Sequence, residues 1–343
     1  MPDEQQEYNA QDRYEVVAEE QRKRRQEQKY LLHIGLFLIT FLTTTIAGTD
    51  WTTGRLGEFQ SDWRYYLIGL PYSISILFVI TCHEFGHYFA ARHHKVRATL
   101  PYYIPFPPIP MFLNFGTMGA VIRTKSIVPS KKAMFDIGAA GPLAGFIACL
   151  ILLIYGFLNV PGKEYILKIH PDYFSPSFGK GGLDLQFGDT LLFSILKFLF
   201  VREGQFFPPM SEIYHYPFLC VGWFGLFITA MNMIPVGQLD GGHISYTMFG
   251  RKNHMKIAVI SFIILFVIGI LGFADSTLKL GIGFGWTGWL FWAVILYLII
   301  KLQHPPVYDE TGLDPKRKIL GYICFIIFGL SFSPTPFILT FSS

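Results

Sequence analysis

One apolar run that ends in ionisable side chains constrains the fold of this chain more than any other feature. The run begins near Tyr65 and continues to Cys82, and His83, Glu84 and His87 follow directly. An apolar run of about 20 residues is long enough to cross a bilayer as a helix. Ionisable groups inside such a helix are costly to bury, so they indicate a functional site.

The spacing of the two histidines suits one metal ion. Residues four apart on a helix lie on the same face, so His83 and His87 can present two imidazoles to a zinc ion. Glu84 lies beside this pair, within reach of a water bound to the metal. The short pattern has a plainer alternative, two interfacial histidines and a glutamate at a helix end. We favour the metal, because it removes the cost of an unpaired Glu84 in lipid.

Composition places the chain in a membrane. Hydrophobic residues make up 51% of it and charged residues 15%, whereas soluble domains carry roughly 25% charged residues. Its four cysteines fall singly inside apolar runs, so they predict neither a disulfide framework nor a Cys-x-x-Cys metal motif. The net charge of +4 gives no nucleic-acid signal. We expect an all-α polytopic membrane protein of about six or seven transmembrane helices, with a small membrane-associated β-hairpin or sheet.

The candidate spans can be checked by the distribution of charge. A cytosolic N-terminus with alternating spans puts 20 of the 28 Lys and Arg residues on the inside, as the positive-inside rule requires. The apolar segment 190–201 is too short to span, so we expect it at the interface. Seven apolar runs are the candidate spans: 30–48, 65–91, 133–158, 217–234, 256–273, 285–300 and 319–339.

Four regions follow from these runs. They are a cytosolic tail at 1–29, an accessory first helix and loop at 30–64, a membrane core at 65–245 and accessory C-terminal helices at 246–343. Prolines exclude a helix after Leu100, and strand formers with glycines follow from Asn114. Within the core we therefore expect a β-element at 97–130, a helix at 133–158, an extracytosolic loop at 159–216 and a helix with a metal ligand at 217–245.

The core helix at 133–158 carries two features of its own. Gly141 and Gly145 predict a small-residue face for close helix packing. Asp136 lies near the start of this helix, where we expect it to cap the helix or to interact with the helix dipole.

A catalytic zinc needs a third protein ligand from another segment. Asp240 is the best candidate, because it follows the fourth span at a similar depth and its neighbouring glycines allow close approach. The alternative is a turn-forming Asp-Gly pair at a helix end. Asn232 has two equal interpretations, a hydrogen bond to a substrate carbonyl or a helix cap. Four other histidines are expected at the interface rather than on the metal: His93, His94, His243 and His304.

Together these residues resemble the site-2 protease family of intramembrane zinc metalloproteases, peptidase family M50. The segment from His83 to His87 looks like the first motif of that family. The segment from Asn232 to Gly241 looks like its second motif, with Asp240 in the ligand position. Residues 116–119 fall where the family has a membrane-associated β-element, and residues 135–145 resemble its glycine-rich third helix. The resemblance covers about 65–245.

The resemblance implies an activity and a cofactor. It implies one zinc ion per chain, held by His83, His87 and Asp240, with Glu84 as the general base. It implies hydrolysis of peptide bonds in or near transmembrane segments, as in regulated intramembrane proteolysis. The partners would be transmembrane protein substrates and the lipid bilayer, and we expect a bacterial inner membrane. Five residues are the expected substrate-binding set: Asn232, Gly116, Thr117, Met118 and Gly119.

Three rival functions stay open from the sequence. A membrane di-iron oxygenase or desaturase also uses histidine boxes, but it needs about eight clustered histidines, and most of the ten in this chain are scattered singly. A transporter with an intramembrane ion site leaves Glu84 without a purpose. The complete ligand set and the presence of Glu84 argue against a non-catalytic member of the same fold. The sequence fixes neither the substrate nor the oligomeric state.

Overall fold

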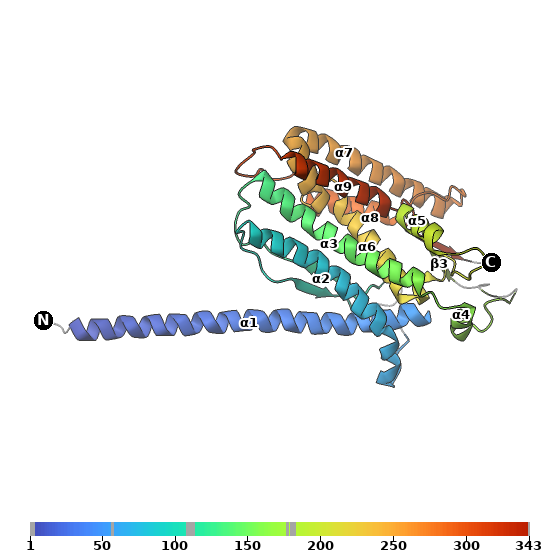
Figure 1. The fold of residues 1–343 in the computed structure, drawn as a ribbon, viewed down its shortest axis with the longest axis horizontal. Coiled ribbons are helices and arrows are strands. Elements are labelled where there is room, and N and C mark those ends of the chain that lie inside the picture. Colours follow the sequence, from blue (N-terminus) through green and yellow to red (C-terminus); the bar gives the residue numbers. More distant parts are fainter. Residues whose placement is uncertain (1–3, 56–57, 108–113, 176–177, 179–182, 342–343) are drawn as a thin grey trace.

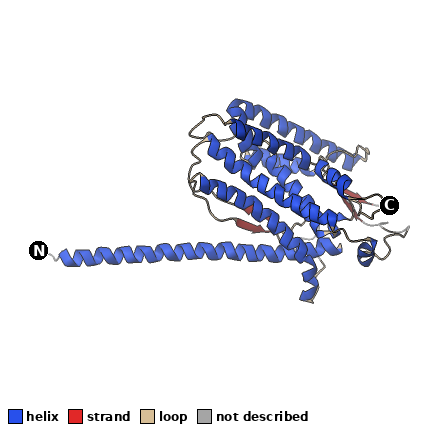
Figure 2. Ribbon diagram, in the orientation of Figure 1, coloured by secondary structure: helices blue, strands red, loops and turns tan. Residues whose placement is uncertain are grey.

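The computed structural model describes residues 4–55, 58–107, 114–175, 178 and 183–341. Helices dominate the described chain, and the strands are short (Figure 2). Most helices form one bundle, with α3 (Lys131–Leu158) between α2 (Leu70–His93) and α6 (Pro217–Met233) (Figure 1). The position of α3 decides which helices can share a site, because it packs against both.

The remaining elements follow the chain around this centre. Before α3 come α1 (Glu4–Thr53), η1 (Trp63–Gly69), β1 (Tyr102–Pro105) and β2 (Thr117–Val121). Between α3 and α6 lie α4 (Lys163–Ile169), β3 (Leu183–Phe187), α5 (Leu191–Phe200) and η2 (Ile213–His215). The C-terminal part holds α7 (Asp240–Leu278), α8 (Gly288–Ile295), the π-helical η3 (Leu296–Ile300), α9 (Pro315–Ser331) and β4 (Phe337–Phe341).

The expected membrane class is confirmed by the lengths of the helices. Among the described residues, four helices are long and apolar enough to cross a bilayer, and they match the first, second, third and fifth expected spans. Shorter apolar helices, Pro217–Met233 and Gly288–Ile300, stand at the fourth and sixth spans. The four long candidates are Lys29–Thr53, Trp63–His93, Lys131–Leu158 and Asp240–Leu278.

The C-terminal end differs from the expectation of a seventh span at 319–339. Helix α9 ends at Ser331, and β4 pairs antiparallel with β3 instead. Pro334 and Pro336 follow the helix directly, and proline can neither donate a helical hydrogen bond nor continue a helix. The sequence analysis did not foresee this second sheet, because β3 and β4 are about 150 residues apart in the chain.

The expected helix at 217–245 is two helices in the structure. Helix α6 ends at Met233 and α7 begins at Asp240, so residues 234–239 form a break between them. Helix α7 then continues to Leu278 with a kink at Gly250, where φ is +75°. Residues 235–255, which lie between the fourth and fifth expected spans, are therefore mostly helical.

Helix α1 joins two regions that the sequence analysis separated. It is one helix of 50 residues, so the expected tail and the first span are continuous, and its N-terminal part runs beyond the bundle (Figure 1). Thr44 Oγ1 lies 2.7 Å from Ser73 Oγ of α2, and Thr43 Oγ1 donates a hydrogen bond of 2.6 Å to the Gly116 carbonyl. The accessory helix thus contacts both α2 and the β-element.

The expected β-element is present as the antiparallel pair β1–β2. Tyr102 pairs with Val121, and Pro105 pairs with Thr117. Gly116 has a φ of +76°, a backbone conformation that side chains other than glycine rarely adopt. The proline-rich residues 108–113, which we expected to be non-helical, lie outside the described residues.

The expected small-residue face lets α2 and α3 approach closely. A β-carbon on Gly86 of α2 would overlap the Ala140 carbonyl of α3. A β-carbon on Gly145 of α3 would lie 3.2 Å from the His83 side chain. Helix α2 is therefore held near α3 at the level of its two histidines, as glycine contacts between membrane helices allow.

Asp136 has a different role from the expected one. Ser130 caps the N-terminus of α3, accepting a hydrogen bond from the Ala133 amide. The Asp136 carboxylate instead receives two hydrogen bonds from Arg317 of α9, at 2.7 and 2.6 Å, and one of 2.7 Å from His94. His94 directly follows α2 and Arg317 belongs to α9. Asp136 of α3 therefore links the end of α2 and α9 to α3 by charge-assisted hydrogen bonds.

Candidate metal centre

Three predicted ligands meet between α2 and the start of α7. His83 Nε2 and His87 Nε2 are 3.0 Å apart, and Asp240 Oδ2 lies 3.4 Å from each of them. Both histidines are buried, and the Asp240 side chain is only 14% exposed. The two imidazoles come from one face of α2, as their spacing predicted, while the carboxylate comes from 153 positions further along the chain.

The separations of the ligand atoms fit a tetrahedral zinc ion. Zinc binds imidazole nitrogen and carboxylate oxygen at about 2.0–2.1 Å, so two ligand atoms of a tetrahedral site are about 3.3–3.4 Å apart. The three separations here, 3.0, 3.4 and 3.4 Å, lie close to that value. Two imidazoles with one carboxylate also form a known catalytic ligand set, which leaves a fourth position open.

A backbone contact from α3 fixes the orientation of His87. Its Nδ1–H donates a hydrogen bond of 2.7 Å to the Ile137 carbonyl. In a neutral ring this bond leaves the lone pair of Nε2 free, and Nε2 is the atom that faces Asp240. The ring also depends on Gly141, because a β-carbon there would lie within 2.5 Å of three of its atoms.

The break before α7 presents Asp240 to the two histidines. Asp240 is the first residue of α7, where a negative charge interacts favourably with the helix dipole. Gly241 packs against the Met233 carbonyl and Gly242 against the Gly237 carbonyl, so a β-carbon at either position would overlap backbone atoms. These glycines allow the chain to fold back tightly and bring a carboxylate to α2.

Glu84 has a partner that the sequence did not reveal. Its side chain is buried, and Oε2 accepts a hydrogen bond of 2.9 Å from the Ile122 amide, directly after β2. Thr81 Oγ1 also lies 2.7 Å from Tyr103 Oη of β1. The β-element is thus attached to α2 at two points beside the ligands. Backbone amides carry no signal in the side-chain pattern, so only the fold could identify this contact.

The predicted substrate-binding residues lie at two elements. Asn232 is half-buried in the last turn of α6, whereas Gly116 directly precedes β2 and residues 117–119 form the start of that strand. Thr117 Oγ1 donates to the Ile104 carbonyl at 2.9 Å, whereas the Met118 side chain is 70% exposed. The roles of these residues in substrate binding stay predictions.

The chain matches one protein-family model over more than half of its length. The model of peptidase family M50 matches residues 71–272, which include all three candidate ligands and Glu84. This chain belongs to peptidase family M50. The match begins in α2 and ends in α7, so the first helix and the last elements of this M50 chain lie outside it.

Curated relatives of this M50 chain are named zinc metalloproteases. The probable zinc metalloprotease EGY2 of Oryza sativa subsp. indica is 32% identical over 253 residues, which cover 74% of this chain and 40% of the relative. The EGY2 of Arabidopsis thaliana is 30% identical, covering 79% and 43%. The EGY1 of Oryza sativa subsp. japonica is 34% identical, covering 68% and 36%.

These relatives limit what can be transferred. The M50 chain spans about two fifths of their length. Their names describe them as chloroplastic, so they give no support to the expected bacterial inner membrane, which stays a prediction.

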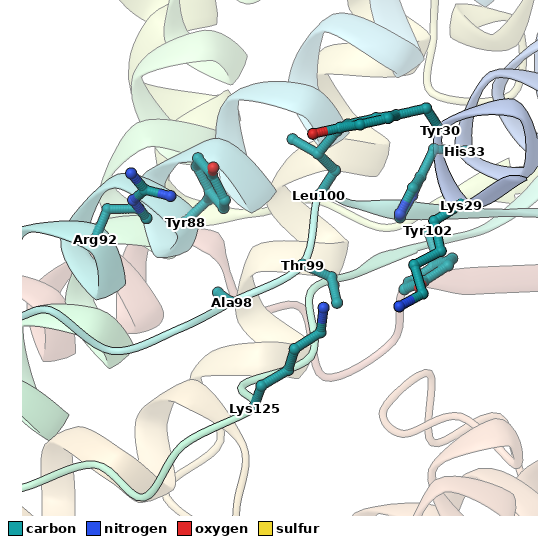
Figure 3. Close-up of a pocket in the computed structure, with 10 residues that line it drawn as sticks. All are labelled: Lys29, Tyr30, His33, Tyr88, Arg92, Ala98, Thr99, Leu100, Tyr102 and Lys125. Atoms are coloured by element: carbon teal, nitrogen blue, oxygen red, sulfur yellow. The ribbon is translucent and has the colours of Figure 1, made fainter. Parts of the chain in front are cut away.

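A basic cavity of the M50 chain includes none of the three metal ligands in its lining. It is an open cavity of about 420 Å³ between α1, the end of α2 and the segment that leads into β1 (Figure 3). Lys29, Arg92 and Lys125 give its lining a positive charge, and tyrosines cover much of the rest. None of the lining residues carries a carboxylate. The cavity therefore lacks the groups for metal-assisted hydrolysis, and the buried cluster remains the candidate site.

The four histidines expected to be interfacial lie outside the ligand cluster. His93 is exposed, and His94 donates to Asp136. His243 Nδ1 lies 2.7 Å from His304 Nε2, and His304 Nδ1–H donates to the Pro305 carbonyl. Burial, together with the neighbouring His243, lowers the pKa of His304 to about 3, so this ring stays neutral at physiological pH.

Proposed function

We propose that this chain is an intramembrane zinc endopeptidase, which hydrolyses peptide bonds in or near transmembrane segments of membrane-protein substrates. The observation that carries the proposal is the meeting of His83, His87 and Asp240 at zinc-ligand distances within apolar helices, with Glu84 beside them. Membership of family M50 and the names of the relatives support it.

The chemistry needs a metal, and three residues of this chain would hold it. Zinc bound by His83, His87 and Asp240 would supply a water of lowered pKa and polarise the scissile carbonyl. Within the protein, the Ile137 carbonyl keeps the proton of His87 on Nδ1, so Nε2 is ready as a ligand.

Glu84 is the group that would move protons. The Ile122 amide holds its Oε2, which leaves Oε1 to take a proton from the attacking water. The same carboxyl group would then return that proton to the leaving amine. Through the hydrogen bond from Ile122, the β-element therefore orients the carboxylate of the general base, Glu84.

The β-element also suits an unwound substrate. Peptide bonds in a transmembrane helix are hidden in helical hydrogen bonds, and once freed in lipid their N–H and C=O groups need new partners. Residues 116–119 could supply them by strand addition, with the exposed Met118 beside the substrate. Asn232 would then hold an extended substrate carbonyl.

The proposal includes a location, and two rival functions have less support than it does. We propose a multi-pass protein with its N-terminus in the cytosol, consistent with the distribution of Lys and Arg. A di-iron oxygenase gains no support from the family or from its relatives. A non-catalytic member of the fold has no use for a buried Glu84 next to complete ligands.

Two substitutions test this function. The full chain, reconstituted in vesicles with a transmembrane reporter substrate, is compared with Glu84→Gln and His83→Ala. We expect Glu84→Gln to keep the zinc of this centre and lose cleavage, because the amide cannot accept a proton. We expect His83→Ala to lose both cleavage and the zinc of this centre. The exposed His93→Ala is the matched control and should cleave normally. Cleavage by Glu84→Gln at the wild-type rate would overturn the assignment of the base.

A further inference from the structure

A second cluster of metal-binding side chains lies in the connection between α3 and α6. His170 follows α4, Glu212 precedes η2 and His215 ends η2. His170 Nε2 and His215 Nε2 are 3.0 Å apart, and Glu212 Oε2 lies 3.4 Å from the second and 3.9 Å from the first. We propose that these three residues bind a second divalent metal ion, of the zinc class.

The separations of the ligand atoms in this cluster can be compared with those of a tetrahedral zinc site, as for the first centre. A tetrahedral zinc site places its ligand atoms about 3.3–3.4 Å apart, and the three values here scatter around that distance. Two imidazoles and one carboxylate form a ligand set that zinc accepts. The geometry is therefore close to that of His83, His87 and Asp240, except that the separation of His170 from Glu212, at 3.9 Å, is wider than any in the first centre.

Glu212 has a buried oxygen that no hydrogen bond satisfies. Its side chain is 6% exposed, and Oε2, the atom that faces both imidazoles, has no hydrogen-bond partner among the described residues. A buried carboxylate oxygen without a partner is costly, and most buried polar atoms are paired. A cation between Glu212 and the two rings would remove that cost.

The backbone orients His215 as a ligand. The fully buried ring donates a hydrogen bond of 2.9 Å from Nδ1–H to the Thr52 carbonyl, near the end of α1. This bond leaves the lone pair of Nε2 directed at the cluster when the ring is neutral, as the partners of metal-bound histidines usually do. Tyr165 Oη also donates to the His215 carbonyl at 2.7 Å, so both the ring and its backbone are held.

Space and access at the cluster also suit an ion. Gly54, with a φ of +70°, borders both rings, and a β-carbon there would lie 3.0 Å from His215 Cε1 and 3.9 Å from His170 Cε1. The His170 side chain is 28% exposed, which gives an ion and a water ligand a route from solvent. Glu212 and His215 are buried, so the exposed ring is the side from which the cluster would be loaded.

The second ion would join the end of α4 to η2, and η2 contacts the end of α1 through His215. Figure 1 shows α4 close to the C-terminal end of α1, at the end of the molecule where the C-terminus lies. The His215–Thr52 bond makes that junction. Trp51 Nε1 donates to the Asn114 carbonyl at 2.7 Å, so the fastened end of α1 also supports the approach to β2. The ion is thus structural, and the expected stoichiometry rises from one to two per chain.

Zinc analysis of the purified 343-residue chain tests the proposal without any assay of activity. After equilibration with buffered zinc in detergent, we expect two ions per chain by elemental analysis. The pair His83→Ala and His87→Ala, which leaves the second cluster intact, should retain one. The pair His170→Gln and Glu212→Gln should also retain one, and the four changes together should retain none.

The controls make each outcome decisive. His93→Ala, an exposed histidine outside both clusters, should bind two ions. Wild-type protein with one ion, or the His83/His87 variant with none, overturns the proposal even if the cluster variants fail to fold. A second ion that remains after His170→Gln and Glu212→Gln, in protein of wild-type helical content by circular dichroism, also overturns it. A loss of proteolysis has no bearing on these counts.

Discussion

Gly141→Ala tests whether the helix contact, and not only the ligands, creates the metal centre. A β-carbon at position 141 would lie within 2.5 Å of three ring atoms of His87, whereas ordinary contact begins at 3.4 Å. The nearest ring atom, Nε2, would lie at 2.1 Å, so the ring must move by about 1.3 Å, or α2 and α3 must separate. Either change breaks a geometry in which zinc–nitrogen distances vary by only about 0.2 Å.

The expected loss is large for zinc and smaller for folding. Disturbing the groups that orient a ligand typically lowers metal affinity by about 10–100-fold, or about 1.4–2.7 kcal/mol. Overpacking of the helix contact adds about 1–3 kcal/mol of destabilisation. Gly145→Ala is the matched control, since its β-carbon would lie 3.2 Å from His83 and needs a shift of only a few tenths of an ångström.

Competition with a chelator measures the zinc affinity of both variants, and thermal unfolding in detergent measures their stability. To keep the second cluster from contributing, both are compared in the His170→Gln, Glu212→Gln background. Gly141→Ala should bind zinc at least ten times more weakly than Gly145→Ala. Equal affinities would refute the argument that glycine at 141 makes room for the His87 ring.

Three further changes probe the neighbouring contacts. Ile122→Pro removes the backbone N–H that donates to Glu84, so cleavage in the reporter assay should fall about 10–100-fold with zinc retained. The control Ile122→Ala keeps this N–H and should cleave normally. Asp136→Ala leaves Arg317 without its main partner, and thermal unfolding should show a loss of about 1–3 kcal/mol. A chelator should abolish cleavage and added zinc restore it; unchanged cleavage would exclude a metal-dependent reaction.

The ligands on α2 could be predicted because the relevant information is local. The spacing of His83 and His87 fixes a shared face on any helix, and the apolar run before them makes a helix the expected structure. Asp240 could be predicted from depth and from the need for a third ligand. Its position at the start of α7 could not, because the break after Met233 includes Gly237, which packs against the carbonyl of Lys301 in a distant part of the chain.

The rest of the site depends on contacts between segments far apart in the chain. His170 and His215 are 45 residues apart, so each seemed to stand alone in the sequence. Asp136 and Arg317 are 181 residues apart, and the local context of Asp136 suggested only a helix-terminal charge. The pairing of β3 with β4 was missed for the same reason, since strand pairing over such a distance leaves no local pattern.

The ligand arrangement has a mechanical consequence. Helices α2 and α7 both pack on α3 and have few contacts with each other, yet one contributes two ligands and the other the third. An ion bound there would act as a cross-link that closes a long loop of chain, so its binding energy would also be folding energy. Removing it would loosen the register between the two helices as well as stop the chemistry.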